Sequence, residues 1–252
     1  PTGSGKSTTL YSILSMLNKP GVNIVTLEDP VEYFIDGVNQ AQIRPEIGLT
    51  FASGLRSILR QDPNIIMVGE IRDRETAELA VNSALTGHLV FSTLHTNSAM
   101  GAIPRLIDMG IEPFLLTASL NLLAAQRLVR KICDKCKTVT KPTEAIEKII
   151  REEIATVDPA ELQGIDMKEI KVWVGRGCPV CGNTGYKGRI GIYETINISK
   201  SIQNMINDRL PASKIQDYAI KEEKFILMRQ DGILKALHGL TTVEEVVRVT
   251  KD

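Results

Sequence analysis

The first eight residues have types and spacing that suit the phosphates of a nucleotide. Gly5, Lys6 and Ser7 match the last three positions of the phosphate-binding pattern G-x-x-x-x-G-K-[ST], and its first glycine would precede Pro1. Backbone N–H groups around the glycines can form an anion-binding concavity, and a following helix points the positive end of its dipole at the same phosphates. We predict that phosphates bind to Thr2, Gly3, Ser4, Gly5, Lys6, Ser7 and Thr8.

Two side chains of this loop have distinct predicted roles. Lys6 is spaced to reach the β- and γ-phosphates of ATP, and Ser7 can place its hydroxyl on Mg²⁺. A glycine-rich turn could contain the same letters by chance. Apolar residues at helical spacing directly afterwards argue against that alternative; they are Leu10, Ile13, Leu14 and Leu17. The sequence therefore predicts a nucleotide-binding protein. Because such a loop normally follows a central strand, we expect the chain to be a fragment of a longer protein. We expect this fragment by itself to hydrolyse ATP poorly.

The composition sets the class of protein. A chain of 252 residues can hold one large domain, or one domain with a small satellite. The 30 Lys and Arg residues balance the 30 Asp and Glu residues, so no global charge favours DNA or an anionic membrane. No segment approaches the roughly 18 consecutive apolar residues of a membrane helix, and aromatic residues are few. We expect a cytosolic α/β domain.

Strand-like and helix-like segments alternate over the first half of the chain. Short apolar strands between amphipathic helices are typical of a parallel sheet covered on both faces. The predicted strands are Asn23–Leu27, Ile65–Val68 and Leu89–Leu94. The predicted helices are Lys6–Leu17, Thr50–Arg60, Arg74–Thr86, Ser98–Asp108 and Pro113–Arg130.

The alternation stops at Cys133. A cysteine-containing, charged and glycine-rich stretch follows to about Gly191, and helical patterning resumes after Ser199. We therefore expect three parts: a nucleotide-binding core over 1–130, a small inserted cysteine unit over 131–191 and a helical subdomain over 192–252.

A carboxylate follows each of two predicted strands. Glu70 ends the buried run Ile65–Val68, where a carboxylate in P-loop enzymes holds Mg²⁺ through water or polarises the attacking water. Glu28 and Asp29 end the preceding strand, which Pro30 stops. We assign Glu28 to the activation of water and Asp29 to its support. A surface glutamate and a simple turn are the structural alternatives.

Two histidines bracket the strand that begins at Leu89. His88 and His95 emerge at opposite ends of it, so the two cannot bind one metal ion. His95 lies at the carboxyl end, where it could sense the γ-phosphate by a hydrogen bond. His88 has either a structural or a functional role.

Three arginines are further candidates. Arg56 and Arg60 are four residues apart and should share a helix face, and Arg72 follows the Glu70 strand. They could form ordinary surface ion pairs, for example with Asp62 or Asp73. Alternatively, they could reach a nucleotide or a carboxylate across a subunit contact, as arginine fingers do.

All four cysteines occur in two C-x-x-C pairs, separated by 41 residues. The pairs are Cys133 with Cys136 and Cys178 with Cys181. Four thiolates provide a closed tetrahedral site for structural Zn²⁺, although the gap exceeds that of a usual zinc ribbon. Disulfides are the main alternative and would be unusual in the cytosol. A nucleic-acid-binding ribbon is a second alternative, which the neutral net charge disfavours.

These segments together resemble a known family, the bacterial ATPases that drive type II secretion and type IV pilus assembly. Leu59–Asp73 resembles the family signature, Leu27–Glu32 its aspartate box and Gly87–Asn97 its histidine box. The closing segment Gly239–Thr250 is similar as well. The signature usually has aspartate at the position of Asn64, which precedes the strand, so we expect little catalytic effect from this departure.

The resemblance implies an α/β fold with a RecA-like P-loop NTPase core, a mainly parallel sheet and a C-terminal helical segment. It further implies a cytosolic ring, usually a homo-hexamer, and an N-terminal companion domain that closes over ATP. Such a motor acts on an inner-membrane platform protein, so the protein should associate peripherally with that membrane. The resemblance also links Arg56, Arg60 and Arg72 to subunit contact and catalysis. Pilus-retraction ATPases lack the cysteine unit, which favours a secretion or pilus-extension motor.

Two alternatives remain at this stage. One is a nucleotide-gated scaffold in which hydrolysis is incidental. The other is a RecA-like nucleic-acid motor, which needs a basic channel; we expect no nucleic-acid partner. The sequence does not choose between a secretion system and a pilus.

Overall fold

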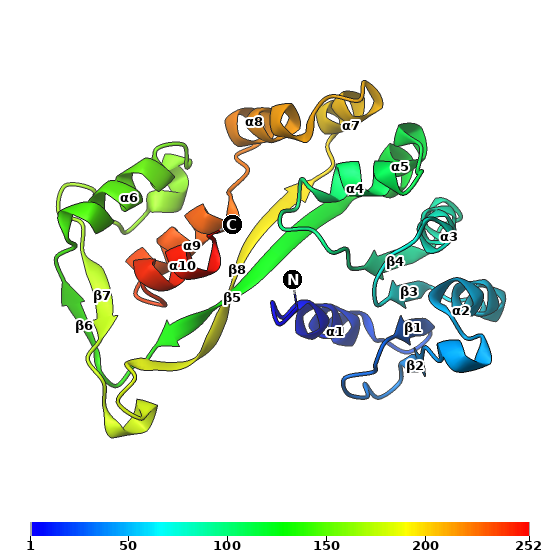
Figure 1. The fold of residues 1–252 in the computed structure, drawn as a ribbon, viewed down its shortest axis with the longest axis horizontal. Helices are drawn as coiled ribbons and strands as arrows, with labels where there is room; N and C mark the ends of the chain where they lie inside the picture. Colours follow the sequence, from blue (N-terminus) through cyan, green and yellow to red (C-terminus); the bar gives the residue numbers. More distant parts are fainter. Residues whose placement is uncertain (1, 252) are drawn as a thin grey trace. The chain divides into compact units, whose positions relative to one another are not determined.

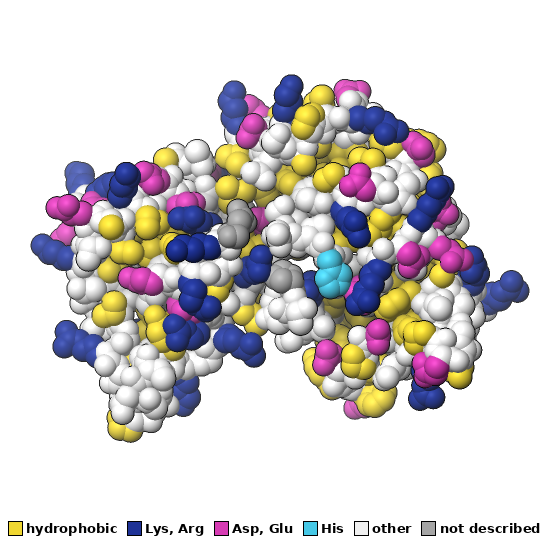
Figure 2. Space-filling view, viewed as in Figure 1, with side chains coloured by type: hydrophobic (Ala, Val, Ile, Leu, Met, Phe, Trp, Pro, Cys, Tyr) yellow, Lys and Arg dark blue, Asp and Glu magenta, His cyan; other side chains and the backbone are white. Residues whose placement is uncertain are grey.

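The computed structural model describes residues 2–251, which divide into two compact units. The first, here called the sheet unit, comprises Lys6–Leu123 and Asn197–Ala212. The second, here called the cysteine unit, comprises residues 2–5, Ala124–Ile196 and residues 213–251. Each unit has an apolar core of its own. Basic and acidic side chains both occur over the face drawn in Figure 2.

Four parallel strands form the sheet of the sheet unit, in the order β2-β1-β3-β4. They are β1 (Ile24–Glu28), β2 (Asn39–Gln42), β3 (Ile65–Val68) and β4 (Leu89–Ser92). Every residue of β1 and β3 is buried, as expected for the central strands of a parallel sheet. The predicted α/β fold with a mainly parallel sheet is confirmed.

Helices cover both faces of this sheet (Figure 1). On one face, Tyr11 of the first helix packs in a core with Ile24 of β1. On the other face, Gly54 approaches Leu27 so closely that an added Cβ would lie 2.8 Å from that side chain. Successive strand residues point to opposite faces, which is why Ile24 and Leu27 meet different helices. The helices of the sheet unit are α1 (Lys6–Leu17), α2 (Phe51–Ile58), α3 (Arg74–Leu85), α4 (Ala102–Asp108), α5 (Pro113–Ser119) and α7 (Lys200–Asn207).

The helix predicted over Pro113–Arg130 is wrong in its second half. Helix α5 ends at Ser119, Leu120 is extended with φ −89° and ψ 120°, and strand β5 runs over Leu122–Ile132. Strand β8 (Tyr186–Asn197) pairs with β5 and points the opposite way in Figure 1. The helix-favouring residues of β5 therefore form a strand because a distant segment supplies its hydrogen-bond partners.

The cysteine unit combines two small sheets with helices. Strands β5 and β8 form one two-stranded sheet, and the antiparallel strands β6 (Lys137–Thr140) and β7 (Val172–Gly175) form the other. The helices in this part of the chain are α6 (Glu144–Ile154), α8 (Ala212–Glu222), α9 (Met228–Leu237) and α10 (Val243–Val249). The apolar faces of α6, α9 and α10 share a buried core with the strands, which includes Val129 of β5 and Ile192 of β8.

A buried carboxylate links α10 to β5 through an ion pair. Glu245, with only 2% of its side chain exposed, accepts hydrogen bonds from Arg130 at 2.5 Å and from Arg248 at 2.8 and 2.9 Å. The Arg130 guanidinium also lies 4.2 Å from the centre of the Tyr186 ring of β8. Burial raises the pKa of Glu245, but the bonds from Arg248 and Arg130 outweigh it and lower that pKa to about 2.

We expect Glu245→Gln to destabilise the cysteine unit by roughly 1–3 kcal/mol, because two arginines lose their counter-ion. The pKa of Glu245 is about 2 in the folded protein and 4.5 without the partners. Its contribution is therefore complete above about pH 4.5 and lost as the pH falls towards 2. Urea unfolding between pH 3 and pH 7 measures this loss. Glu244→Gln, at the exposed neighbour on α10, is the control, and an unchanged acid dependence in Glu245→Gln would contradict the assignment.

Candidate functional site

The predicted phosphate loop leads directly into α1. Gly3 and Gly5 have left-handed backbone angles, with φ of 74° and 90°, which glycine adopts without strain. Lys6 and Ser7 lie in the first turn of α1. The hydroxyl of Ser4 is buried, and the described residues offer it no hydrogen-bond partner. A glycine loop, a helix start and an orphaned buried hydroxyl together fit an anion such as a phosphate.

The carboxyl ends of three neighbouring strands meet at one edge of the sheet. Leu27 pairs with Val68, and the Gly69 N–H donates to the Leu27 carbonyl at 2.7 Å. The pairing continues beyond the strands, because the Ile71 N–H donates to the Thr93 carbonyl at 2.9 Å. This register brings the segments of Glu28, Glu70 and His95 to the edge where parallel α/β sheets bind ligands.

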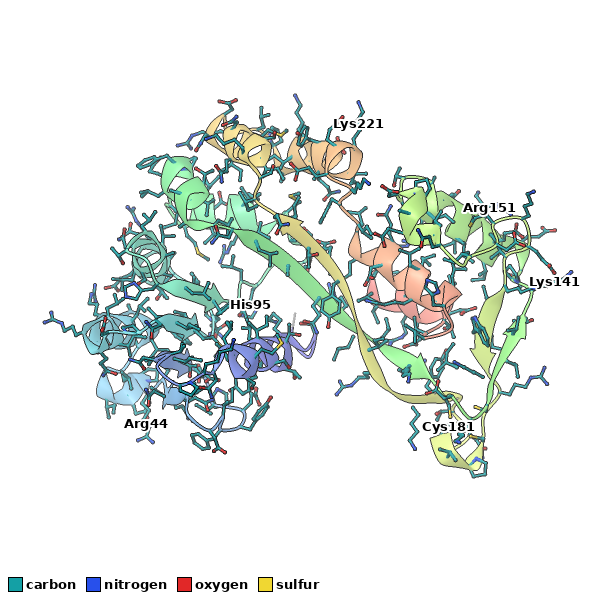
Figure 3. All side chains as sticks on the ribbon, turned by 180° about the vertical axis from the view of Figure 1, so that it is seen from behind. Arg44, His95, Lys141, Arg151, Cys181 and Lys221 are labelled. Atoms are coloured by element: carbon teal, nitrogen blue, oxygen red, sulfur yellow. The ribbon has the colours of Figure 1, made fainter. Side chains whose placement is uncertain are left out.

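Glu70 is held there by two cationic or polar neighbours. Its carboxylate lies 2.6 Å from a guanidinium nitrogen of Arg72 and 2.6 Å from Nε2 of His95. Figure 3 shows His95 just beyond the sheet. Burial raises the pKa of Glu70, but the hydrogen bonds from Arg72 and His95 outweigh burial. The pKa of Glu70 is therefore below its usual value, and the carboxyl stays ionised. The sequence predicted each of these residues and did not predict that they contact one another.

Glu28 is more enclosed than Glu70. Its side chain accepts hydrogen bonds from the Tyr11 hydroxyl, from Thr26 Oγ1 at 2.5 Å and from Gln40 Nε2 at 3.1 Å. Asp29, the expected supporting residue, is exposed. The sequence prediction missed all three donors of Glu28. The spacing of Tyr11, one helical turn after Ser7, was the available signal for one of them.

The arginines differ from their predicted pairing. Arg56 pairs with Glu75 of α3 and with neither of the expected aspartates, and Asp73 instead caps α3 through a 2.8 Å bond to the Thr76 N–H. Arg60 lies in the 3-10 turn Leu59–Gln61 after α2, so it does not continue the α-helical face of Arg56. This tightening of the last turn is common at helix ends.

His88 and His95 lie at opposite ends of β4. The Nδ1 atom of His88 lies 2.9 Å from the carbonyl oxygen of Ser83, in the last turn of α3. His95 follows the strand and contacts Glu70. His88 therefore has a local structural partner away from the carboxylates.

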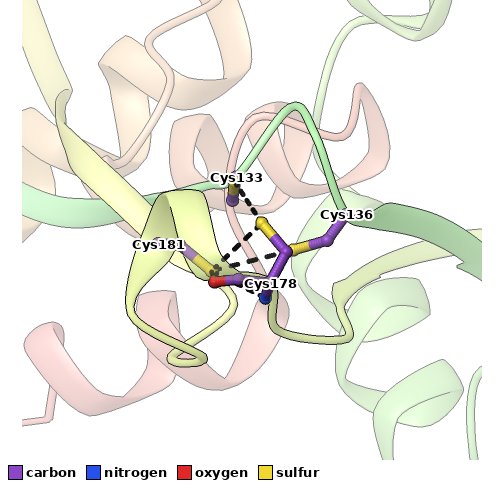
Figure 4. A group of neighbouring side chains, drawn as sticks. All are labelled: Cys133, Cys136, Cys178 and Cys181. Carbon is purple, nitrogen blue, oxygen red and sulfur yellow. Dashed lines mark hydrogen bonds between the residues drawn. The ribbon is translucent and has the colours of Figure 1, made fainter.

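The four cysteines converge in the cysteine unit (Figure 4). The sulfurs of Cys133 and Cys178 are 3.9 Å apart, those of Cys136 and Cys181 are 3.9 Å apart, and those of Cys178 and Cys181 are 3.7 Å apart. All four sulfurs lie within 4.8 Å of one another, and all four are free thiols. A disulfide needs about 2.05 Å, so these distances describe a cluster of separate sulfurs.

This donor set fits zinc. Sulfurs at the corners of a tetrahedron with Zn–S bonds of about 2.3 Å are about 3.8 Å apart. The N–H groups of Cys178 and Gly185 donate to the Cys181 sulfur at 3.2 and 3.3 Å. Burial raises the pKa of the Cys181 thiol, but these N–H groups and the neighbouring thiols lower it to about 6. The loop thus favours the thiolate form of Cys181, the form that a metal ion requires, whereas burial raises the pKa of the Cys136 thiol to about 12.

Comparisons with known proteins agree on one family. A family model described as type II/IV secretion system protein matches residues 1–248. Type II secretion system protein E of Pseudomonas aeruginosa is 49% identical over 252 residues, which are 100% of this chain and 47% of that protein. The type IV pilus assembly ATPase PilB of Thermus thermophilus is 49% identical over 251 residues, which are 99% of this chain and 27% of that protein.

A solved structure has the same fold. The crystal structure of the pilus retraction motor PilT with bound ADP superposes with a TM-score of 0.68 and 30% sequence identity, covering 100% of this chain and 60% of that one. This chain thus spans about half the length, or less, of the curated relatives above. None of the helices in the described part of the chain is long and apolar enough to cross a membrane.

Proposed function

Because this chain belongs to the family of type II/IV secretion system proteins, we propose that it is the ATP-hydrolysing core of a motor for type II secretion or pilus assembly. The observation that carries the proposal is the meeting of Glu28, Glu70 and His95 at one sheet edge, with Glu28 bonded to the helix that starts at the phosphate loop. The ADP bound by the structurally similar PilT supports a nucleotide ligand.

Each residue of this edge has a proposed role. Lys6 and the backbone N–H groups of the loop neutralise the β- and γ-phosphates. Glu70, kept ionised by Arg72 and His95, orients the attacking water, and Glu28 accepts its proton. His95 senses the γ-phosphate by a hydrogen bond, and its 2.6 Å contact with Glu70 couples that interaction to the carboxylate.

Hydroxyl and carboxylate oxygens are the donors that Mg²⁺ prefers, which supports magnesium as the metal of this site. Ser7 would hold it, with Glu70 acting through water. Mg²⁺ supplies charge neutralisation on the phosphates during transfer. Arg56 and Arg60 are exposed, which suits residues that complete a neighbouring subunit's site, whereas Arg72 pairs with Glu70 of its own chain.

The remaining proposals concern the whole protein. We infer a homo-hexameric ring, an N-terminal companion domain and an inner-membrane platform protein as partners, with a cytoplasmic location at that membrane and no nucleic-acid ligand. We also propose that the chain is organised into three parts: a nucleotide-binding core over 1–130, a tetracysteine unit over 131–191 and a helical subdomain over 192–252. The tetracysteine cluster is proposed to bind Zn²⁺ as a structural ion, since four protein ligands leave no open position for catalysis.

Lys6→Ala in the full-length protein tests the nucleotide assignment. We expect ATP affinity to fall about tenfold or more, because the phosphates lose their main side-chain cation. Equilibrium binding of ATP with Mg²⁺ measures it. Lys19→Ala, at an exposed lysine just after the same helix, is the matched control. Equal affinity of Lys6→Ala and wild type would remove the assignment.

A further inference from the structure

The environment of Glu28 contains groups that the proposed mechanism does not yet use. Glu28 is only 4% exposed, and three side chains donate to its carboxylate. The Tyr11 hydroxyl donates to Oε2, while Thr26 and Gln40 donate to Oε1. A carboxylate has about four acceptor positions. The described donors use three of them, which leaves one direction for a water molecule.

Tyr11 is itself held on several sides. Its side chain is buried in the core between α1 and the sheet, with 1% exposure. Its ring and the Tyr33 ring form a T-shaped contact, with centroids 4.6 Å apart. Its hydroxyl oxygen accepts a bond from the Glu32 N–H at 3.2 Å. The phenol therefore has one fixed position, and its proton points at Glu28.

The proton of this phenol is retained at every working pH. Burial is the main cause that raises the pKa of Tyr11, and the bond to Glu28 adds to it, bringing it to about 12. Tyr11 therefore acts as the hydrogen-bond donor in its contact with the Glu28 carboxylate.

The position of Tyr11 along α1 connects its hydrogen bond with Glu28 to the phosphate loop. Tyr11 follows Ser7 by four residues, so both side chains lie on the same side of the helix, one turn apart. We propose that Tyr11, together with Thr26, is a positioning residue for ATP hydrolysis: the two hydroxyls hold the Glu28 carboxylate in fixed alignment with the phosphate-loop helix. This inference rests on the proposed function, in which Glu28 accepts the proton of the attacking water.

A purely structural tyrosine gives a different expectation. If the hydroxyl only satisfied buried groups, its removal would lower stability and leave the kinetic constants of the folded protein unchanged. If it aligns Glu28, its removal lowers kcat, because a misplaced base reduces the fraction of productive geometries. ATP binding depends on the phosphate loop and should be retained in either case.

Tyr11→Phe in the full-length, assembled protein tests the proposal, since it removes the hydroxyl and keeps the ring. We expect kcat for ATP hydrolysis to fall about tenfold to a hundredfold, with KM changing by less than about twofold. Tyr33→Phe is the matched control, because the structure gives its hydroxyl no partner among the described residues; its kcat should equal that of the wild type. Unchanged kcat in Tyr11→Phe overturns the proposal. Thr26→Val, close in shape, decides in the same way if Tyr11→Phe does not fold.

A double-mutant cycle with Glu28→Gln separates this inference from the proposed function. If Tyr11 acts through Glu28, adding Tyr11→Phe to Glu28→Gln should change kcat by less than about twofold. A full additional loss in the double variant overturns the positioning role. Normal turnover of Glu28→Gln alone removes the proposed role of Glu28. A slow Glu28→Gln beside a normal Tyr11→Phe leaves that role intact and removes only the inference.

Discussion

Glu70→Gln in the full-length protein should reduce ATP turnover by at least about a hundredfold while ATP binding persists. The amide keeps the size of the side chain and removes its charge. Arg72 and His95, both 2.6 Å from the carboxylate, would then face a neutral group. The neutral amide cannot orient the attacking water as the anion does, while Lys6 and the loop still hold the phosphates. Steady-state ATPase assays beside equilibrium nucleotide binding measure both quantities.

Glu78→Gln provides the matched control for this result. Glu78 is a more exposed carboxylate in the same unit, and it also forms an ion pair, with Arg74 at 2.6 Å. We expect normal turnover from this variant. Normal hydrolysis by Glu70→Gln would remove Glu70 from the reaction. Intact secretion or piliation by a variant that binds ATP without hydrolysing it would instead favour the nucleotide-gated scaffold.

Cys133→Ser should remove the metal ion and unfold much of the cysteine unit. Loss of one of four thiolates weakens a structural zinc site, whose binding energy is also folding energy. Cys133 is coupled to the rest of the unit, because its N–H donates to Gly185 at 2.9 Å and the preceding Ile132 N–H donates to Leu240 at 3.0 Å. We expect bound zinc to fall from about one per chain to near zero and the unfolding midpoint to fall by about 10 °C or more.

Metal analysis, thiol titration and thermal unfolding of the purified protein measure these changes without an activity assay. Val180→Ser is the matched control, since Val180 is a half-exposed residue between Cys178 and Cys181 and its replacement removes no thiol. ATP binding should survive in Val180→Ser, because this variant keeps all four thiols and changes no residue of the phosphate loop. Wild-type protein without bound metal, or with two disulfides, would refute the structural zinc site.

Most of the candidate site could be predicted from local sequence. The phosphate loop is a contiguous motif, and the helix after it follows from apolar spacing, so Lys6–Leu17 has the same limits in the structure. Glu28 and Glu70 could be placed at a sheet edge because each ends a short apolar run. The cysteine pairs needed only their two-residue spacing. These features depend on neighbours within one or two turns of chain, where residue type and backbone geometry are directly linked.

Tertiary structure decided which of these residues meet. The segment from Leu122 has good helix formers, yet pairing with β8 makes it a strand. The contacts of Tyr11 with Glu28, and of Arg130 with Glu245, join segments whose spacing in the sequence carries no periodic signal. The two cysteine pairs are local motifs, but their convergence depends on the fold of the 41 residues between them. The sequence by itself thus determined the chemical groups and the elements that hold them. Only the folded chain determined their partners, because packing and hydrogen bonding between distant segments outweigh local preference.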